Sequence, residues 1–194
     1  MKKIIIALAF LITVTLSAQE KNKPESNAGI KGGYNLSAVS FDGNSKTENL
    51  HGFHVGFYGE SFIGSNTSFQ VEILYSQQGY KIVDSGGTYT QELDYINLPL
   101  MFKVYPVKQM FLEIGPQIGF SISHKETIDS GFVLYDSTKE FEPNNFDWGL
   151  NFGGGFKSEG GVSIGARYHL GFNDIYDEDK PKNRVWQFYI GFDF

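Results

Sequence analysis

The chain has 194 residues, no cysteine and a formal net charge of −6. The lack of cysteine excludes disulfides and thiolate metal sites, and the acidic balance argues against nucleic acid as a partner, because phosphate binding requires clustered lysine and arginine. Hydrophobic residues make up 41% of the chain, yet no apolar run reaches the roughly 20 residues of a membrane-spanning helix.

The N-terminus has the features of a secretory signal peptide. Two lysines follow Met1, an apolar run extends from Ile4 to Leu16, and Ala18 is a small residue before a predicted cleavage site. The run is about 13 residues long, which is too short to span a bilayer as a helix. No cysteine follows the site, so a lipid-anchored N-terminus is excluded.

We therefore expect three regions: a signal peptide at residues 1–18, a flexible periplasmic N-terminus at 19–27, and one domain at 28–194. Removing the first region takes away two of the 16 basic residues and leaves 14 against 22 acidic ones, a net charge of −8. The mature chain is therefore even less suited to nucleic acid than the full chain.

Eight segments of the domain alternate apolar and polar residues with a period of two, which is the pattern of β-strands and not of helices. In residues 95–105, Ile96, Leu98 and Leu100 share one face, whereas Asn97 and Lys103 lie on the other. The pattern predicts an all-β domain. Its segments are 28–39, 51–61, 68–80, 91–105, 110–123, 145–157, 161–172 and 184–194.

The gaps between these segments alternate in length, which indicates a barrel in an outer membrane. The long, polar gaps are 40–50, 81–90, 124–144 and 173–183, and the short ones are 62–67, 106–109 and 158–160. Outer-membrane barrels have short periplasmic turns and longer outside loops. We therefore predict an eight-stranded antiparallel up-and-down transmembrane β-barrel in the outer membrane of a Gram-negative cell, in contact with its lipid.

A soluble β-sandwich would also show alternation, and it is the alternative fold. Two features argue against it. The apolar face is heavily aromatic, in a chain with 18 phenylalanines, 11 tyrosines and two tryptophans. In addition, many of the 23 glycines fall inside predicted strands, where the core of a sandwich prefers side chains that pack.

The last strand has an almost wholly apolar and aromatic face, which is predicted to contact lipid. By resemblance to other outer-membrane proteins, an aromatic C-terminal strand that ends in phenylalanine is the signal that the barrel-assembly machinery recognises. The residues of this face are Trp186, Phe188, Ile190, Phe192 and Phe194.

The opposite faces of the strands carry ionisable residues, which are predicted to point into the lumen. An eight-stranded barrel is only wide enough for side chains, so these charges must form pairs or hydrogen bonds. Four basic and five acidic residues favour a lumen closed by a polar network, and a narrow porin-like channel is the alternative. They are Lys31, Glu60, Glu72, Lys103, Glu113, Asp147, Lys157, Arg167 and Asp193, accompanied by His54 and His169.

No catalytic residue, metal site or cofactor is predicted. Enzymes that resemble the lipid A deacylases need a histidine and a serine two residues apart on one strand face. Here glycine lies two residues after His54 and after His169, and His124 is directly beside Ser123. A lipid-modifying enzyme is therefore the least favoured function.

Two other motifs have some features of ligand sites. Acidic residues in 174–179 could bind Ca²⁺, but the spacing of a dedicated calcium loop is missing, which favours a solvated acidic loop. Three glycines at 153–155 are not followed by the Gly-Lys-Ser/Thr sequence of a phosphate-binding loop, and no βαβ pattern surrounds them. We interpret them as small residues at a crowded part of the barrel.

The longest gap, 124–144, is the predicted site of any protein partner. It contains the apolar run 132–135 (F-V-L-Y), and apolar residues on an exposed loop can mark a contact surface. The run also alternates enough to extend the fifth and sixth predicted strands as a hairpin above the membrane.

Four segments resemble, in the same order, the Bacteroidetes porin family, or PorT-like outer-membrane β-barrel proteins. They are 95–105 (YINLPLMFKVY), 115–119 (GPQIG), 146–156 (FDWGLNFGGGF) and 165–171 (GARYHLG). The resemblance implies a small outer-membrane barrel, and its PorT members are linked to type IX secretion and gliding. We therefore expect a non-catalytic barrel with a structural, surface-interaction or secretion-associated role.

Overall fold

The computed structural model describes residues 26–40, 47–84, 87–130, 133–135, 144–176 and 180–194. The predicted signal peptide at 1–18 and all but the end of the predicted N-terminal segment at 19–27 lie outside the described residues. Among the residues that the structure describes, no helix is long and apolar enough to cross a membrane.

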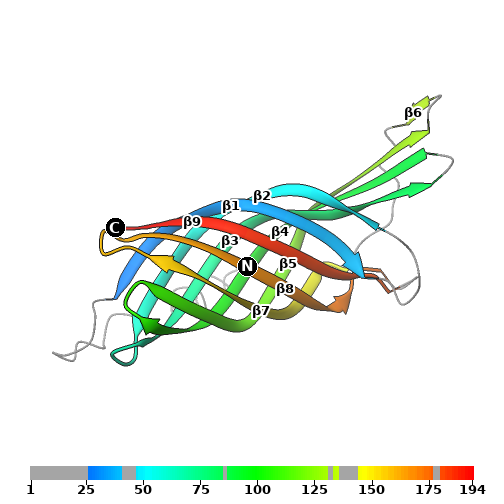
Figure 1. Cartoon of the computed structure of the whole chain (residues 1–194). Coiled ribbons are helices and arrows are strands. Elements are labelled where there is room, and N and C mark those ends of the chain that lie inside the picture. Colours follow the sequence, from blue (N-terminus) through cyan, green and yellow to red (C-terminus); the bar gives the residue numbers. More distant parts are fainter. Residues whose placement is uncertain (1–25, 41–46, 85–86, 131–132, 136–143, 177–179) are drawn as a thin grey trace, which may run out of the picture.

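The described chain forms one antiparallel sheet that closes on itself. Each strand pairs with its neighbour along the chain, and β9 returns to pair with β1, which closes a ring of eight strands (Figure 1). The predicted fold, an all-β eight-stranded antiparallel barrel, is therefore confirmed. The ring consists of β1 (Asn27–Ser40), β2 (Thr47–Phe62), β3 (Thr67–Asp84), β4 (Gly87–Val107), β5 (Met110–Ser130), β7 (Phe146–Lys157), β8 (Val162–Asp174) and β9 (Lys182–Asp193).

A ninth strand, β6 (Val133–Tyr135), lies outside the ring and pairs only with the end of β5. The predicted hairpin of the fifth and sixth strands is thus present only as this short pairing. The continuous sixth strand of the ring, β7, begins at Phe146. Residues 136–143 of the predicted partner loop lie outside the described residues.

Residues that alternate along the sequence point alternately into the barrel and away from it. On β5, Leu112 and Ile114 are 61% and 49% exposed, whereas Glu113 between them is 3% exposed. A barrel in a bilayer has lipid outside and side chains inside, so apolar residues are favourable on the outer face. This is the reverse of a soluble protein, in which the apolar residues would be buried.

Three connections are short: residues 63–66, 108–109 and 158–161. They lie at the same end of the barrel as the C-terminus, where the Phe194 amide donates a hydrogen bond to the Ala28 carbonyl at 2.8 Å. This is the end that the sequence predicts to face the periplasm, and we call it the periplasmic end. The opposite end is the extracellular end.

Strands β3, β4 and β5 are longer than predicted. The sequence predicted boundaries at 80, 91 and 123, but β3 continues to Asp84, β4 starts at Gly87 and β5 ends at Ser130. The extra residues extend the sheet beyond the barrel at its extracellular end (Figure 1). Above a membrane both faces of a strand can be polar, so the polar composition that indicated loops is also compatible with strands.

Glycines on the inner face make room for aromatic rings from the neighbouring strand. Tyr58 lies directly across from Gly29, and Tyr189 directly across from Gly165. A Cβ atom on Gly165 would be 2.5 Å from the Tyr189 ring, and one on Gly29 would be 2.4 Å from the Tyr58 ring. These glycines therefore allow large tyrosine side chains to fill a narrow lumen.

Candidate functional site: the polar lumen

The predicted lumen residues all point into the barrel, at three heights. Lys31, Glu72, Lys103, Glu113 and Arg167 are buried near its middle. Glu60 is also buried, close to the periplasmic mouth, where Lys157 and Asp193 are partly exposed. Asp147 is buried nearer the extracellular end.

Arg167 is the centre of the lumen, because its guanidinium joins two carboxylates from opposite sides. Nε and Nη2 donate to Glu113 at 2.9 and 3.0 Å, and Nη1 and Nη2 donate to Glu72 at 2.9 and 2.7 Å. Both contacts are bidentate, which is the strongest geometry for an arginine–carboxylate pair. The three residues come from β8, β5 and β3, so the contacts bridge the barrel.

Lysines and a tyrosine complete this layer. Lys31 Nζ donates to Glu72 at 2.8 Å and lies 4.1 Å from the centroid of the Tyr189 ring. The Tyr189 hydroxyl donates to Glu113 at 2.9 Å. Each carboxylate thus receives donors from several strands, as a buried charge requires.

A second layer lies at the periplasmic mouth around Glu60. It accepts hydrogen bonds from Ser68 at 2.6 Å, Tyr105 at 2.5 Å and Lys157 at 2.8 Å. Lys157 also pairs with Asp193 at 2.9 Å. The Glu60 carboxylate thus accepts hydrogen bonds from three strands at the inner end of the mouth.

Lys103 connects the two layers. Its Nζ lies 3.8 Å from Glu60 and donates to Gln70 at 2.7 Å, and Gln70 in turn donates to Glu72 at 2.5 Å. The result is a contiguous set of four cations and four carboxylates, which we call the ion network. Its members are Lys31, Lys103, Lys157, Arg167, Glu60, Glu72, Glu113 and Asp193.

Asp147, the fifth acidic residue of the predicted lumen set, is placed apart from the ion network. Its Oδ2 is 3.1 Å from His169 Nε2, and His169 Nδ1 is 2.8 Å from Asn151 Oδ1. Within the described ranges no ion pair joins Asp147 to the other eight residues. The excess of one negative charge that the sequence shows in the lumen is therefore located beside a histidine.

The extracellular end of the lumen is filled by an apolar cluster. Val39, Tyr80, Leu93, Tyr95 and Ile175 are buried there and pack together. The cluster lies on the far side of the ion network from the periplasmic mouth, so polar and apolar side chains fill the lumen in succession.

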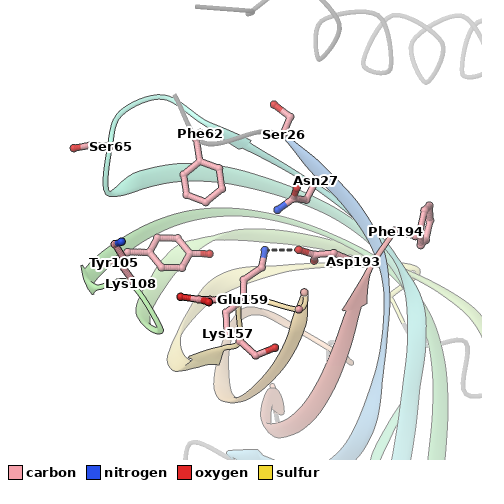
Figure 2. A pocket seen from close by; sticks show the side chains of 13 residues that line it. Ser26, Asn27, Phe62, Ser65, Tyr105, Lys108, Lys157, Glu159, Asp193 and Phe194 are labelled. Atoms are coloured by element: carbon pink, nitrogen blue, oxygen red, sulfur yellow. Dashed lines mark ion pairs between the residues drawn. The ribbon is translucent and has the colours of Figure 1, made fainter. Parts of the chain in front are cut away.

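The periplasmic mouth holds a cavity of about 680 Å³, which no pattern in the sequence predicts. Phe62, Tyr105 and Lys108 line it, and the Lys157–Asp193 ion pair closes its inner end (Figure 2). The lining comes from the start of β1, from the C-terminus and from the short turns, which no local sequence signal brings together.

Three histidines have described side-chain hydrogen bonds, to asparagine, aspartate and tyrosine. His54 Nδ1 contacts Asn35 at 2.7 Å, and both ring nitrogens of His169 contact oxygens of Asn151 and Asp147. His51 lies on the outer face, where it contacts the Tyr34 hydroxyl. In the part of the chain that the structure describes, no group of three or more histidine, aspartate or glutamate residues could hold a metal ion.

The five predicted residues of the C-terminal signal lie together on the outer face of β9. Trp186, Phe188, Ile190 and Phe192 are 42–47% exposed, and Phe194 is 80% exposed. Trp186 also contacts Tyr168 of β8 at a ring-centroid distance of 4.9 Å. The surface that this strand offers to lipid is therefore apolar and mostly aromatic.

Residues 17–177 match the family described as "Outer membrane protein beta-barrel domain". No protein of curated function matches the sequence. Among solved structures, the chain is similar to Ail, the attachment invasion locus protein of Yersinia pestis, in complex with the heparin analogue sucrose octasulfate. That similarity has 18% identity and a TM-score of 0.51, over 88% of this chain and 100% of Ail.

Neisserial surface protein A is a second similar structure, with 11% identity and a TM-score of 0.56, over 88% of this chain and 100% of that one. At such identities the similarity concerns the fold alone. The family match, by contrast, covers most of the sequence. Together with the closed ring of eight strands, it shows that this chain belongs to the outer membrane protein beta-barrel domain family and is a protein of the outer membrane.

Proposed function

We propose that this protein is a non-catalytic outer-membrane barrel whose lumen is closed and whose role is structural or interactive. Envelope integrity, contact at the cell surface and attachment to a secretion assembly all belong to this role. The observation that carries the proposal is the ion network, which joins side chains from all parts of the ring across the lumen.

A solute that crossed the barrel would have to separate these pairs. Removing one partner from a buried pair costs about 3–5 kcal/mol, because the other charge is left without compensation. Arg167 takes part in two such pairs at once. The apolar cluster at the extracellular end adds a second obstruction. The packing thus favours a rigid, filled lumen over the narrow passive channel that is the alternative.

The extension of β3, β4 and β5 supports an interactive role. It carries an ordered part of the sheet beyond the barrel on the extracellular side (Figure 1). Ail, which has a similar fold, was solved in complex with a heparin analogue. We propose that contacts of this protein also involve its extracellular elements, including loop 124–144. Membership of the PorT-like branch, and with it a link to secretion, stays a prediction.

Conductance in planar bilayers tests the closed lumen. We expect the purified wild-type barrel to give no stable current steps. A variant that combines Glu72→Ala, Glu113→Ala and Arg167→Ala with Leu93→Ala and Tyr95→Ala removes the centre of the ion network and part of the apolar cluster, and should conduct. The matched control, Leu112→Ala with Phe152→Ala and Ile164→Ala, shortens three lipid-facing side chains and should stay silent. Reproducible nanosiemens steps from the wild type would instead establish the passive channel.

The composition of lipid A tests the absence of lipid-modifying activity. We expect mass spectrometry of lipid A to be unchanged when the gene is deleted, because the described hydrogen bonds of the two buried histidines go to Asn35, Asn151 and Asp147 and not to a serine. A change in acylation that the wild-type gene restores would contradict the non-catalytic role.

A further inference from the structure

Two buried histidines of the lumen each contact the side-chain oxygen of an asparagine through Nδ1. The distance is 2.7 Å from His54 to Asn35 Oδ1 and 2.8 Å from His169 to Asn151 Oδ1. Both histidines are 1% exposed. They differ in one respect: His169 Nε2 also lies 3.1 Å from Asp147 Oδ2, whereas the described hydrogen bond of His54 goes to Asn35 alone.

The neighbours of Asn151 determine which end of its amide faces His169. Asn151 Nδ2 donates to Gln117 Oε1 at 3.0 Å and lies 3.8 Å from Met101 Sδ. A thioether sulfur is an acceptor only, so the end of the amide beside Met101 must be the donor. The oxygen end is therefore turned to His169, which must donate a proton to it from Nδ1.

The other ring nitrogen of His169 also faces an acceptor, because an ionised Asp147 carboxylate has no proton to give. A neutral imidazole has one N–H and one bare nitrogen, so it could satisfy only one of the two contacts. The imidazolium satisfies both. Imidazole is a stronger base than a carboxylate, so the proton between Nε2 and Oδ2 belongs to the ring. Gly149, between Asp147 and Asn151 on β7, makes room for this ring: a Cβ atom there would be 2.7 Å from His169 Cε1.

The other titratable groups around His169 do not supply a charge to Asp147. Arg167, two residues earlier on β8, is already bound by two carboxylates. Tyr95 of β4 interacts with Asp147 and is uncharged at neutral pH. The residues of β9 that lie across from His169 and Arg167 are uncharged: Val185 and Gln187.

His54 has different surroundings. Its Nδ1 donates to Asn35, whose Nδ2 donates to two backbone oxygens at 3.2 and 2.7 Å and so keeps its own oxygen turned to the ring. One proton satisfies this contact. The charged neighbours of His54 are Lys31, Arg167 and Glu72, so a second proton would add a charge beside two cations and one carboxylate.

We propose that His169 is a buried imidazolium that forms an ion pair with Asp147, whereas His54 is neutral. The pair supplies a fifth cation, so the charges of the lumen balance. Folding then takes up a proton at His169, which makes the stability of the extracellular half of the lumen fall as the pH rises. The inference concerns the charge of the lumen and does not depend on the closed-barrel role, which the conductance experiment tests separately.

Nitrogen-15 NMR of the histidine rings in the full mature barrel tests the assignment. In detergent micelles at about pH 7, we expect protons on both ring nitrogens of His169 and on one ring nitrogen of His54. The ring signals are assigned through the backbone, so the result does not depend on a variant that folds. One protonated and one bare nitrogen on His169 would overturn the proposal.

Asp147→Asn tests whether the carboxylate holds the second proton. This variant should leave His169 with a single ring proton at the same pH, because the charge is no longer compensated. The matched control is Asp193→Asn, an inner-face aspartate that pairs with Lys157, and it should leave the His169 signals unchanged. A doubly protonated His169 in Asp147→Asn would contradict the ion pair.

Urea unfolding at about pH 6 and about pH 8 tests the consequence for stability. The experiment uses a His54→Gln background, because a histidine that is neutral when folded gives a pH dependence of opposite sign. This variant should unfold at a lower urea concentration at the higher pH. Adding Asp147→Asn and His169→Gln removes the pair and should remove the decrease, with folding checked by heat-modifiable mobility on gels. An equal decrease with and without the pair would overturn the proposal.

Discussion

At the scale of single residues, Arg167 shows why this lumen needs arginine. Its planar guanidinium has donors on two edges, which allows it to bind Glu72 and Glu113 at the same time. Lysine carries the same charge as a point and cannot make two bidentate contacts. The residue is 1% exposed, so each contact is made away from bulk water.

Replacing Arg167 by leucine is expected to lower the free energy of unfolding by about 3–5 kcal/mol, because two buried glutamates are left facing each other. Arg167→Lys should lie between leucine and wild type. Urea unfolding in lipid vesicles, followed by tryptophan fluorescence, measures the difference. Lys108→Met, in the exposed turn after β4, is the control and should change stability by less than about 0.5 kcal/mol.

Replacing the whole set of charges separates the buried charge from the packing. The quadruple variant Lys31→Met, Glu72→Gln, Glu113→Gln, Arg167→Met removes two cations with two carboxylates, leaves Lys103 and Lys157 with Glu60 and Asp193, and should be more stable than Arg167→Leu alone. Equal or lower stability of the quadruple variant would mean that packing, and not charge, dominates the loss.

Gly165 offers a second test at this scale. Because a Cβ atom there would be 2.5 Å from the Tyr189 ring, Gly165→Ala should displace the ring from Glu113 and cost about 1–3 kcal/mol. In a Tyr189→Ala background the same alanine should cost less, since the ring is gone. A double-mutant cycle of unfolding free energies checks this coupling. Additive effects would contradict the close approach.

The sequence predicted which face of the sheet each charged residue occupies, but not which residues it contacts. Alternation places Glu113 and Arg167 on inner faces from local information alone. Their contact joins residues 54 positions apart. It depends on which strands lie opposite each other and on their relative height, which only the closed barrel determines.

At the scale of elements, β9 has two roles, one structural and one predicted in assembly. As a strand of the ring it pairs with β1 and β8, and as the last strand it carries the predicted assembly signal. The Phe194 side chain is 80% exposed, so it adds little packing within the folded protein. A strong effect of Phe194 on biogenesis would therefore act before folding is complete, at recognition.

Phe194→Asp is expected to reduce insertion into the outer membrane several-fold, while a barrel refolded in vitro keeps near-normal stability. Heat-modifiable mobility of outer-membrane fractions measures insertion. Phe156→Asp is the matched control, because Phe156 is a lipid-facing phenylalanine on β7, outside the C-terminal strand. Equal loss of insertion for both variants would contradict a C-terminal signal.

The extension of β3, β4 and β5 shows where the element pattern was misleading. Residues 81–90 are polar and were predicted to form a loop, yet β3 and β4 pair up to Asp84 and Gly87. Polar composition marks the end of the membrane, where lipid no longer requires apolar residues. It does not mark the end of a strand, because backbone pairing continues wherever the neighbouring strand does.

At the scale of the whole molecule, the barrel has an apolar outer surface and a charged interior. Closing the sheet removes its edges, so no backbone groups in the ring are left open to lipid. The ion network balances four cations with four carboxylates inside the ring. The barrel can therefore serve as a stable support for the strands that extend beyond it.

Deleting residues 130–137 tests this separation of support and surface. The deletion removes β6 and Ser130, the last residue of β5, whose described pairing is with β6, so we expect normal insertion and heat-modifiable mobility. Partners that co-purify from native outer membrane with the wild type should be lost. Retention of all such partners would remove the support for loop 124–144 as a contact site. A control deletion of turn residues 63–66 is expected to damage the barrel itself.

The sequence by itself determined the compartment, the strand class and the side of each charge, because alternation, the apolar N-terminal run and the aromatic last strand are local patterns. The tertiary structure alone decided that Asp147 meets His169 and that Lys157 bridges Glu60 and Asp193. It also revealed the periplasmic cavity. These depend on strand register and on closure of the ring, which bring distant residues to one height in the lumen.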